Sequence, residues 1–166
     1  TGTWLVACGE NPSVYRAATS SQAMRPLALR QPLAFLRHLL GSTERERVTA
    51  ALFRLKAGQV AGIYQHVFSG LAAEFGVTIV AGSVLLPEPT VRDGVVTAGR
   101  GPLYNVSAVF GPDGRAHPRL ALKAFPITSE LPFIGAAPAD DLPIFETPAG
   151  RLGVLVCADA WYPQAY

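Results

Sequence analysis

Apolar residues recur along this chain in two different patterns. Short apolar runs, typical of buried strands, occur at residues 3–8, 77–83, 104–110, 120–123, 144–147 and 152–156. Apolar residues at helical spacing occur instead at residues 33–40, 44–56 and 61–75. The last of these segments is the clearest helix, because Ile63, Val67, Leu71 and Phe75 fall on one stripe. The pattern therefore predicts helices and strands that follow one another along the chain.

Capping residues and glycines predict where these helices begin and end. Ser42 or Thr43 is a candidate cap for the second helix, and Gly58 is expected just past its end. Gly76 is expected to close the third helix. Residues 13–32 are mixed and contain two prolines, so they predict a loop with at most a short helical piece.

Turn sequences predict two β-hairpins in the second half of the chain. Asp113-Gly114 separates the third and fourth apolar runs, which is a strong hairpin signal. Pro148-Ala149-Gly150 separates the last two runs. Hairpins combined with helix-connected strands predict an α/β architecture, in which a mixed sheet is covered by helices.

Composition limits the classes of function. The 166 residues suffice for one domain, and 49% hydrophobic with 16% charged residues is typical of a globular protein rich in buried strands. The net charge is +2, and the 14 Lys and Arg are scattered, so nucleic acid is not expected as a partner. No stretch approaches the ~20 apolar residues of a membrane span, and no membrane partner is expected.

Two features bear on the compartment. Cys8 and Cys157 are too few for a disulfide framework, and both lie in apolar runs, which favours free thiols in a reducing compartment. The first residues lack the basic leader and cleavage pattern of a signal peptide. We therefore predict a cytoplasmic protein. Because a core strand begins within three residues of the first position, the sequence is expected to be a fragment.

Three reactive residues, Glu10, Lys123 and Cys157, each stand where an apolar run stops. Binding and catalytic residues of α/β sheets lie at the ends of the strands, so these side chains could converge. A thiol needs a carboxylate to take its proton, and a nearby ammonium favours both the thiolate and an oxyanion. The structural alternatives are a buried core cysteine, a solvated lysine at a strand end and a carboxylate in a turn.

The segments around these residues resemble the nitrilase superfamily of carbon–nitrogen hydrolases. The resemblance lies in residues 4–11, Leu-Ala-Leu-Lys at 120–123, and Gly-Val-Leu-Val-Cys-Ala-Asp at 153–159 followed by Tyr162-Pro163. It extends over most of residues 60–164, and residues 4–11 carry it more weakly. The family places a Glu, a Lys and a Cys, in that chain order, at strand ends.

The resemblance implies a role for each of these residues. Cys157 would be the nucleophile, Glu10 the general base and Lys123 the cation beside the tetrahedral intermediate. Glu130 would be an auxiliary residue that orients the lysine or binds substrate, or else an ordinary loop carboxylate. Ala158 would help form the oxyanion hole through its backbone N–H, and Trp161 and Tyr162 would bind substrate. No cofactor or metal is implied.

The resemblance also implies a fold and a substrate class. The family fold is a four-layer αββα sandwich, of which residues 1–166 would be a single domain, incomplete at both ends. Ala158, Gln164 and Phe125 replace the residues usual at their positions in the family. Ala158-Asp159 favours a small amide or carbamoyl substrate over a nitrile. The family also implies a homo-oligomer.

Two alternatives to hydrolysis remain open. An N-acyltransferase of the same superfamily would pass the thioester's acyl group to an amine. A non-catalytic protein of the same fold would bind a small ligand or a protein partner instead. A nucleotide-binding domain is disfavoured, because Gly99-Arg-Gly101-Pro is not a phosphate loop followed by a helix.

Overall fold

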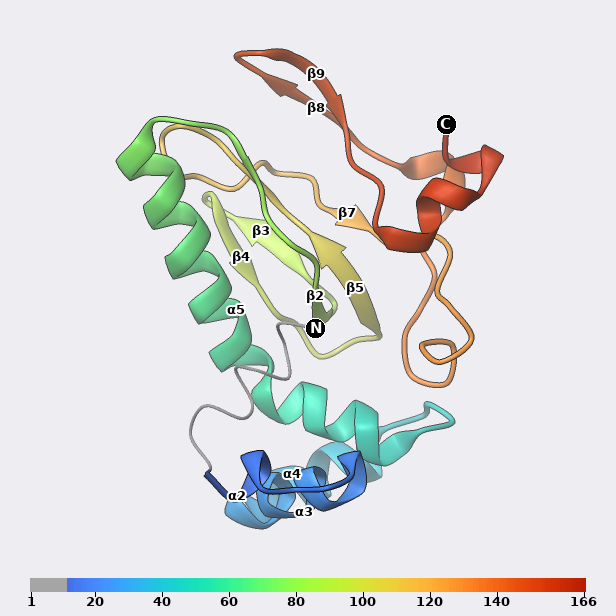
Figure 1. The fold of residues 1–166 in the computed structure, drawn as a ribbon. Helices are drawn as coiled ribbons and strands as arrows, with labels where there is room; N and C mark the ends of the chain where they lie inside the picture. The colour runs from blue at the N-terminus through green and yellow to red at the C-terminus, as the bar shows by residue number, and fades with distance from the viewer. Residues whose placement is uncertain (1–11) are drawn as a thin grey trace.

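A 29-residue helix, α5 (Arg47–Phe75), runs beside the strands in the computed structural model, which describes residues 12–166 (Figure 1). Its buried face, which includes Val60 and Tyr64, packs against an apolar cluster of the strands around Leu86 and Phe110. In Figure 1 the first part of the helix crosses the molecule near α4, and the second part follows the sheet. The structure is thus α/β, as predicted, with the main core between α5 and the strands.

The two helices predicted within this stretch are one continuous helix. Gly58 does not end a helix, and neither Ser42 nor Thr43 is the N-cap predicted for it, because α5 begins at Arg47 after Glu46. A glycine inside a helix costs about 1 kcal/mol relative to alanine. Burial of the neighbouring Ala57, together with Val60, offsets that cost. The end of the helix is confirmed, since Gly76 has a left-handed backbone with φ 61°.

The apolar stripe of α5 read from the sequence is not its buried face. Ile63, Val67 and Leu71 are each about two-fifths exposed, and Phe75 is 65% exposed. The buried face includes Tyr64 instead, whose hydroxyl oxygen accepts a hydrogen bond of 3.0 Å from the Ala108 N–H. Burial raises the pKa of Tyr64 to about 12.

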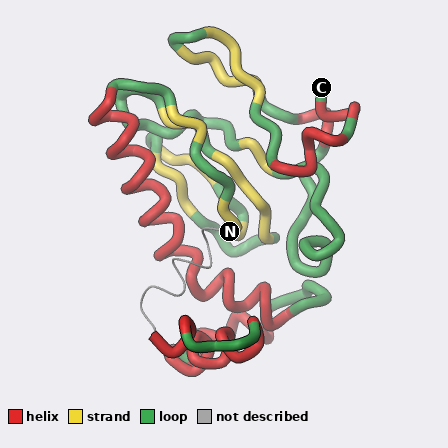
Figure 2. The backbone as a smooth tube through the Cα atoms, viewed as in Figure 1, coloured by secondary structure: helices red, strands yellow, loops and turns green. Residues whose placement is uncertain are grey.

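The N-terminal helices gather at one end of α5 (Figure 2). They are α2 (Pro12–Tyr15), α3 (Ser20–Arg30) and α4 (Pro32–Gly41). The loop predicted at residues 13–32 is therefore wrong, although the helix predicted at 33–40 is confirmed. The Thr19 hydroxyl caps α3, and Leu27 packs with Leu52 of α5, so tertiary packing maintains the helix despite Pro26.

The strands of residues 12–166 form four small antiparallel sheets. The largest has the order β2-β5-β7, with Val84 opposite Val106 and Val106 opposite Leu122. The other three are the pairs β1-β6, β3-β4 and β8-β9. The bounds are β1 (Ile79–Val80), β2 (Val84–Pro87), β3 (Thr90–Arg92), β4 (Val95–Thr97), β5 (Leu103–Ser107), β6 (Val109–Phe110), β7 (Ala121–Leu122), β8 (Ile144–Thr147) and β9 (Gly150–Gly153).

Several predicted strands are shorter than expected, and the predicted mixed sheet is wrong for the described residues. Every strand pair within residues 12–166 is antiparallel. The strand predicted at residues 3–8, which precedes the helices, lies outside the described residues. The run at 104–110 is interrupted at Ala108, because its N–H bonds to Tyr64 and not to a neighbouring strand.

The turns of both predicted hairpins form. In the first, the Gly111 N–H bonds to the Arg115 carbonyl and the His117 N–H bonds to the Val109 carbonyl, but β7 then pairs with β5. In the second, β8 pairs directly with β9. In the described part of the chain, three 3₁₀ helices follow β7, namely η1 (Ala139–Asp141), η2 (Cys157–Trp161) and η3 (Pro163–Ala165). Among the described helices, none combines the length and the apolarity needed to cross a bilayer.

Candidate active site

Lys123 lies directly after β7, with its side chain inside the protein. Its backbone N–H donates a 2.8 Å hydrogen bond to the Asn105 carbonyl on the neighbouring strand β5. Only 1% of its side chain is exposed, and Nζ lies 2.6 Å from Glu130 Oε2. A buried ammonium requires a partner of opposite charge, and the structure supplies this one.

Glu130 is held by three donors. Its Oε2 accepts from Lys123 and, at 2.9 Å, from the Ile127 N–H, and its Oε1 accepts from Asn105 Nδ2 at 3.1 Å. Burial alone would raise the pKa of Glu130, but the hydrogen bonds from Lys123, Ile127 and Asn105 and the lysine charge outweigh burial. The pKa of Glu130 is therefore lowered, and its carboxylate stays charged beside the lysine.

Cys157 is the first residue of η2, in the tight turn that follows β9. The strand predicted at 152–156 ends earlier, at Gly153, because β9 pairs only with the short strand β8. Cys157 is exposed, and its backbone φ is 55°, in the left-handed region. A side chain in that conformation costs of order 1–3 kcal/mol, and such strain clusters at functional sites. Similar strained turns present the nucleophile in α/β hydrolases.

Asp159 joins the cysteine turn to the lysine loop. Its side chain is fully buried, and Oδ1 accepts hydrogen bonds from the backbone N–H groups of Ala124 at 3.1 Å and Phe125 at 2.8 Å. Its Oδ2 accepts from the Val156 N–H at 3.0 Å. One carboxylate thus holds the residues after Lys123 next to the residue before Cys157.

Neither Asp159 nor Asn105 was among the residues predicted from the sequence. The available signal was chemical: each is a polar side chain inside a mostly apolar run, and such a residue is buried only if it is hydrogen-bonded. Both side chains are buried and bonded in the structure, to Ala124, Phe125 and Val156 in one case and to Glu130 in the other.

The remaining predicted residues are placed differently. Ala158 is buried next to the cysteine, whereas the Trp161 side chain is 76% exposed. Tyr162 stacks on Phe125 with ring centroids 4.1 Å apart and an interplanar angle of 10°. Glu10 and Cys8 lie outside the described residues. The structure therefore brings Lys123 together with Glu130, and connects both to the Cys157 turn through Asp159.

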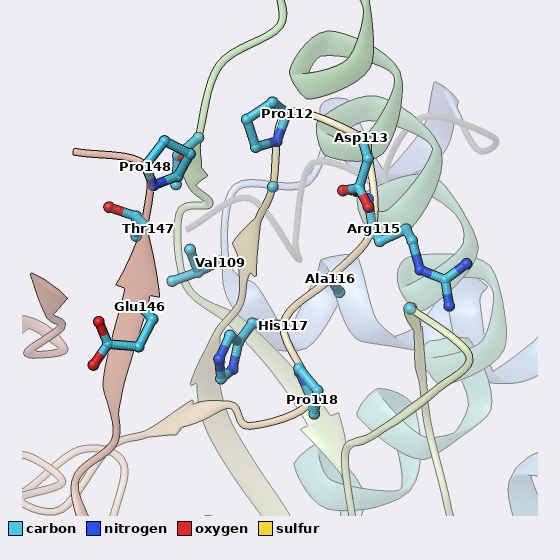
Figure 3. A pocket seen from close by; sticks show the side chains of 13 residues that line it. Val109, Pro112, Asp113, Arg115, Ala116, His117, Pro118, Glu146, Thr147 and Pro148 are labelled. Atoms are coloured by element: carbon cyan, nitrogen blue, oxygen red, sulfur yellow. Dashed lines mark hydrogen bonds between the residues drawn. The ribbon is translucent and has the colours of Figure 1, made fainter. Parts of the chain in front are cut away.

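A separate cavity of about 330 Å³ lies between β8 and the turn that follows β6 (Figure 3). Glu146 and Thr147 lie on its β8 side and His117 faces them, but it contains none of the predicted catalytic residues. The His117 ring meets Phe145 edge-on at 4.9 Å. Within residues 12–166 no group of three or more His, Cys, Asp and Glu side chains is arranged to hold a metal ion.

Comparison with known proteins identifies relatives over about two-thirds of the chain. The omega-amidase NIT2 of Danio rerio is 33% identical over 118 residues, which are 68% of this chain and 39% of that protein. The omega-amidase NIT2-A of Xenopus laevis is 30% identical over 65% of this chain and 37% of its own length. The "Probable hydrolase YhcX" of Bacillus subtilis is 26% identical over 61% of this chain and 17% of its own length.

The matched region is therefore less than two-fifths of each relative's length. No family model and no solved structure matches the chain.

Proposed function

Since this chain is a partial nitrilase-like domain, we propose that the full-length protein hydrolyses a carbon–nitrogen bond of a small amide or carbamoyl compound through a thioester on Cys157. The names of the omega-amidase relatives support an amide substrate. The observation that carries the proposal is the Asp159 carboxylate, which bonds at 2.8 Å to the Phe125 N–H and at 3.0 Å to the Val156 N–H. It attaches the loop of a buried lysine to the turn of an exposed, strained cysteine.

The proposed reaction assigns the attack to the Cys157 sulfur. Glu10 takes the thiol proton, and the thiolate attacks the carbonyl carbon to form a tetrahedral oxyanion. The ammonium of Lys123 and the backbone N–H of Ala158 stabilise that charge. The oxyanion collapses, the nitrogen takes the proton from Glu10, and ammonia leaves. Water then attacks the thioester, its proton passes through Glu10 to the sulfur, and a carboxylic acid is released.

Glu130 has a positioning role in this scheme. A lysine side chain has four rotatable bonds, so it needs a fixed partner if its charge is to be held at one point. The 2.6 Å contact with Glu130, itself held by the Ile127 N–H and Asn105, provides that partner. We further propose that the full-length protein adopts the four-layer αββα sandwich and assembles as a homo-oligomer.

The test uses the full-length protein and a panel of small amides, with ammonia release as the assay. We expect Cys157→Ala to reduce turnover by at least about a thousandfold. Mass spectrometry is expected to detect an acyl group on Cys157 in the wild type and none on Cys8. Iodoacetamide should label Cys157 far faster than Cys8.

Two outcomes would count against the proposal. Full turnover by Cys157→Ala would remove the cysteine from the mechanism. The absence of an acyl adduct with every amide, nitrile and acyl donor tried would favour a non-catalytic binding protein of the same fold. Transfer of the acyl group to an added amine, in preference to water, would instead identify an N-acyltransferase.

A further inference from the structure

A second, strongly basic cavity lies between the N-terminal helices and the loop after β4. It has a volume of about 260 Å³ and is lined by Arg37, His38, Gly41, Arg54, Gly99 and Arg100. None of these residues belongs to the predicted catalytic set. Three guanidinium groups around one cavity would repel each other, so the sources of compensating charge decide what the cavity can bind.

Arg54 forms a rigid, charge-paired wall. Its side chain is 11% exposed and pairs with Glu44. It also donates to the Gly101 carbonyl at 3.1 Å and to the Ser42 hydroxyl at 3.4 Å. These bonds fix the guanidinium before any ligand arrives, which lowers the entropic cost of binding.

The loop that carries Arg100 is also fixed. Glu88 Oε2 accepts hydrogen bonds from the backbone N–H groups of Arg100 and Gly101, both at 3.1 Å. Gly99 lies so close to Glu88 that an added Cβ would be 2.5 Å from Oε2. The Glu88 carboxylate thus holds the loop by its backbone, while the Arg100 side chain remains exposed.

Arg37 and Arg100 supply the excess positive charge. Within residues 12–166 neither side chain forms an ion pair with a carboxylate. Residues 12–43 contain four arginines and no Asp or Glu. The nearby carboxylates bind other groups: Glu44 pairs with Arg54, and Glu88 accepts a hydrogen bond from the backbone of the Arg100 loop. Two cations therefore face the cavity without an anionic partner in the described chain.

The pKa of His38 responds to the positive charge around this cavity. Its partial burial and the positive charges of Arg37, Arg54 and Arg100 together lower its pKa. A neutral imidazole keeps one N–H donor, so His38 can still donate a hydrogen bond to an anion.

We propose that this cavity binds a phosphate group, with Arg37 and Arg100 neutralising its charge against the fixed wall of Arg54. Guanidinium groups suit this ligand because their planar donors match phosphate oxygens in pairs. The phosphate could belong to a soluble ester or to a lipid headgroup. Helix α4 exposes Leu33, Leu36 and Leu40 at 83%, 48% and 70%, so a headgroup would meet an apolar surface beside the cavity.

The first test titrates the full-length protein with inorganic phosphate and follows the His38 imidazole by NMR. Bound phosphate should raise the pKa of His38, because its negative charge offsets that of the arginines. Arg37→Gln and Arg100→Gln should each weaken phosphate binding about tenfold or more. Arg151→Gln is the matched control, since Arg151 is an exposed arginine on β9 and lies outside this cavity.

The second test separates the two sources of phosphate. The protein is sedimented with phosphatidylcholine vesicles, with and without phosphatidic acid. Binding that needs phosphatidic acid and is lost in both Arg37→Gln and Leu33→Ser would identify a lipid headgroup. Binding of inorganic phosphate without vesicle binding would identify a soluble ester. The proposal is overturned if neither probe binds, or if binding survives in the Arg37→Gln/Arg100→Gln double variant.

Discussion

Two ion pairs of equal length lie in contrasting parts of this molecule. Lys123 meets Glu130 at 2.6 Å in the candidate site, and Arg119 meets Asp141 at 2.6 Å on the surface. The first two side chains are 1% and 17% exposed, and the second two are 51% and 74% exposed. The distance is the same, so any difference in energetic consequence must come from the surroundings.

Burial makes the loss of one partner far more costly in the Lys123–Glu130 pair than in the Arg119–Asp141 pair. An exposed pair contributes about 0–1 kcal/mol, because water and salt already stabilise its separate charges. Removing one member of a buried pair costs about 3–5 kcal/mol, because the other charge remains without solvent or partner. A buried lysine is thus an expensive feature, and its cost is consistent with the chemical role proposed for Lys123.

Replacing Lys123 tests the comparison most strongly. Lys123→Met should lower the free energy of unfolding by about 3–5 kcal/mol, because it leaves the Glu130 carboxylate buried without its cation. Denaturant titration of the full-length protein measures this. Lys123→Met/Glu130→Leu should recover part of the loss. A loss below about 1 kcal/mol in the single variant would show that the pair behaves like a surface pair.

Asp159 gives the next largest effect. Asp159→Asn puts an amide NH₂ group near donors that need an acceptor, so at least one buried N–H of Ala124, Phe125 or Val156 loses its partner. We expect a loss of about 1–3 kcal/mol in the free energy of unfolding and a loss of the proposed amide hydrolysis. Asp141→Asn, the same change on the surface, is the control, and similar losses in both variants would contradict the inference.

The pH dependence of stability should follow Glu130. Its pKa is lowered in the folded state, so its contribution is complete above the ordinary carboxyl value of 4.5 and is lost as the pH falls below that value. We expect the stability difference between wild type and Glu130→Gln to shrink as the pH is lowered from 7 to below 4.5. A difference independent of pH would mean that the carboxylate charge does not stabilise the fold.

The surface pair should give the smallest effect. Arg119→Gln should change the free energy of unfolding by less than about 1 kcal/mol, and added salt should reduce even that change. Denaturant titrations at low and high salt would measure both quantities. A loss above about 2 kcal/mol would show that burial does not separate the two pairs.

The sequence predicted turns and helix ends better than it predicted the lengths of helices and strands. The β8–β9 hairpin, α4 and the helix end at Gly76 were predicted, because turn residues and helical spacing are local signals. The interruption at Ala108 was not, because it depends on Tyr64, 44 residues earlier in the chain. For the same reason, packing of Leu27 on Leu52 gave a helix where the prolines predicted a loop.

The candidate site was predicted in part. Positions at the ends of apolar runs pointed to Lys123 and Cys157, and the family resemblance added Glu130. The structure places Lys123 and Glu130 in contact. Asp159 was missed, because its importance lies in bonds to backbone N–H groups 34 and 35 residues away. Backbone donors carry no side-chain signature, so residue type alone does not reveal such a link.

The left-handed backbone at Cys157 sets activity against stability at that one position. Glycine adopts this conformation without the penalty that any side chain incurs, so Cys157→Gly should fold more favourably than Cys157→Ala while both lack the thiol. Selection for stability alone would therefore remove the residue on which the proposed chemistry depends. If the proposed chemistry holds, the glycine variant would serve as a well-folded, inert form of the full-length protein for capturing intact substrate.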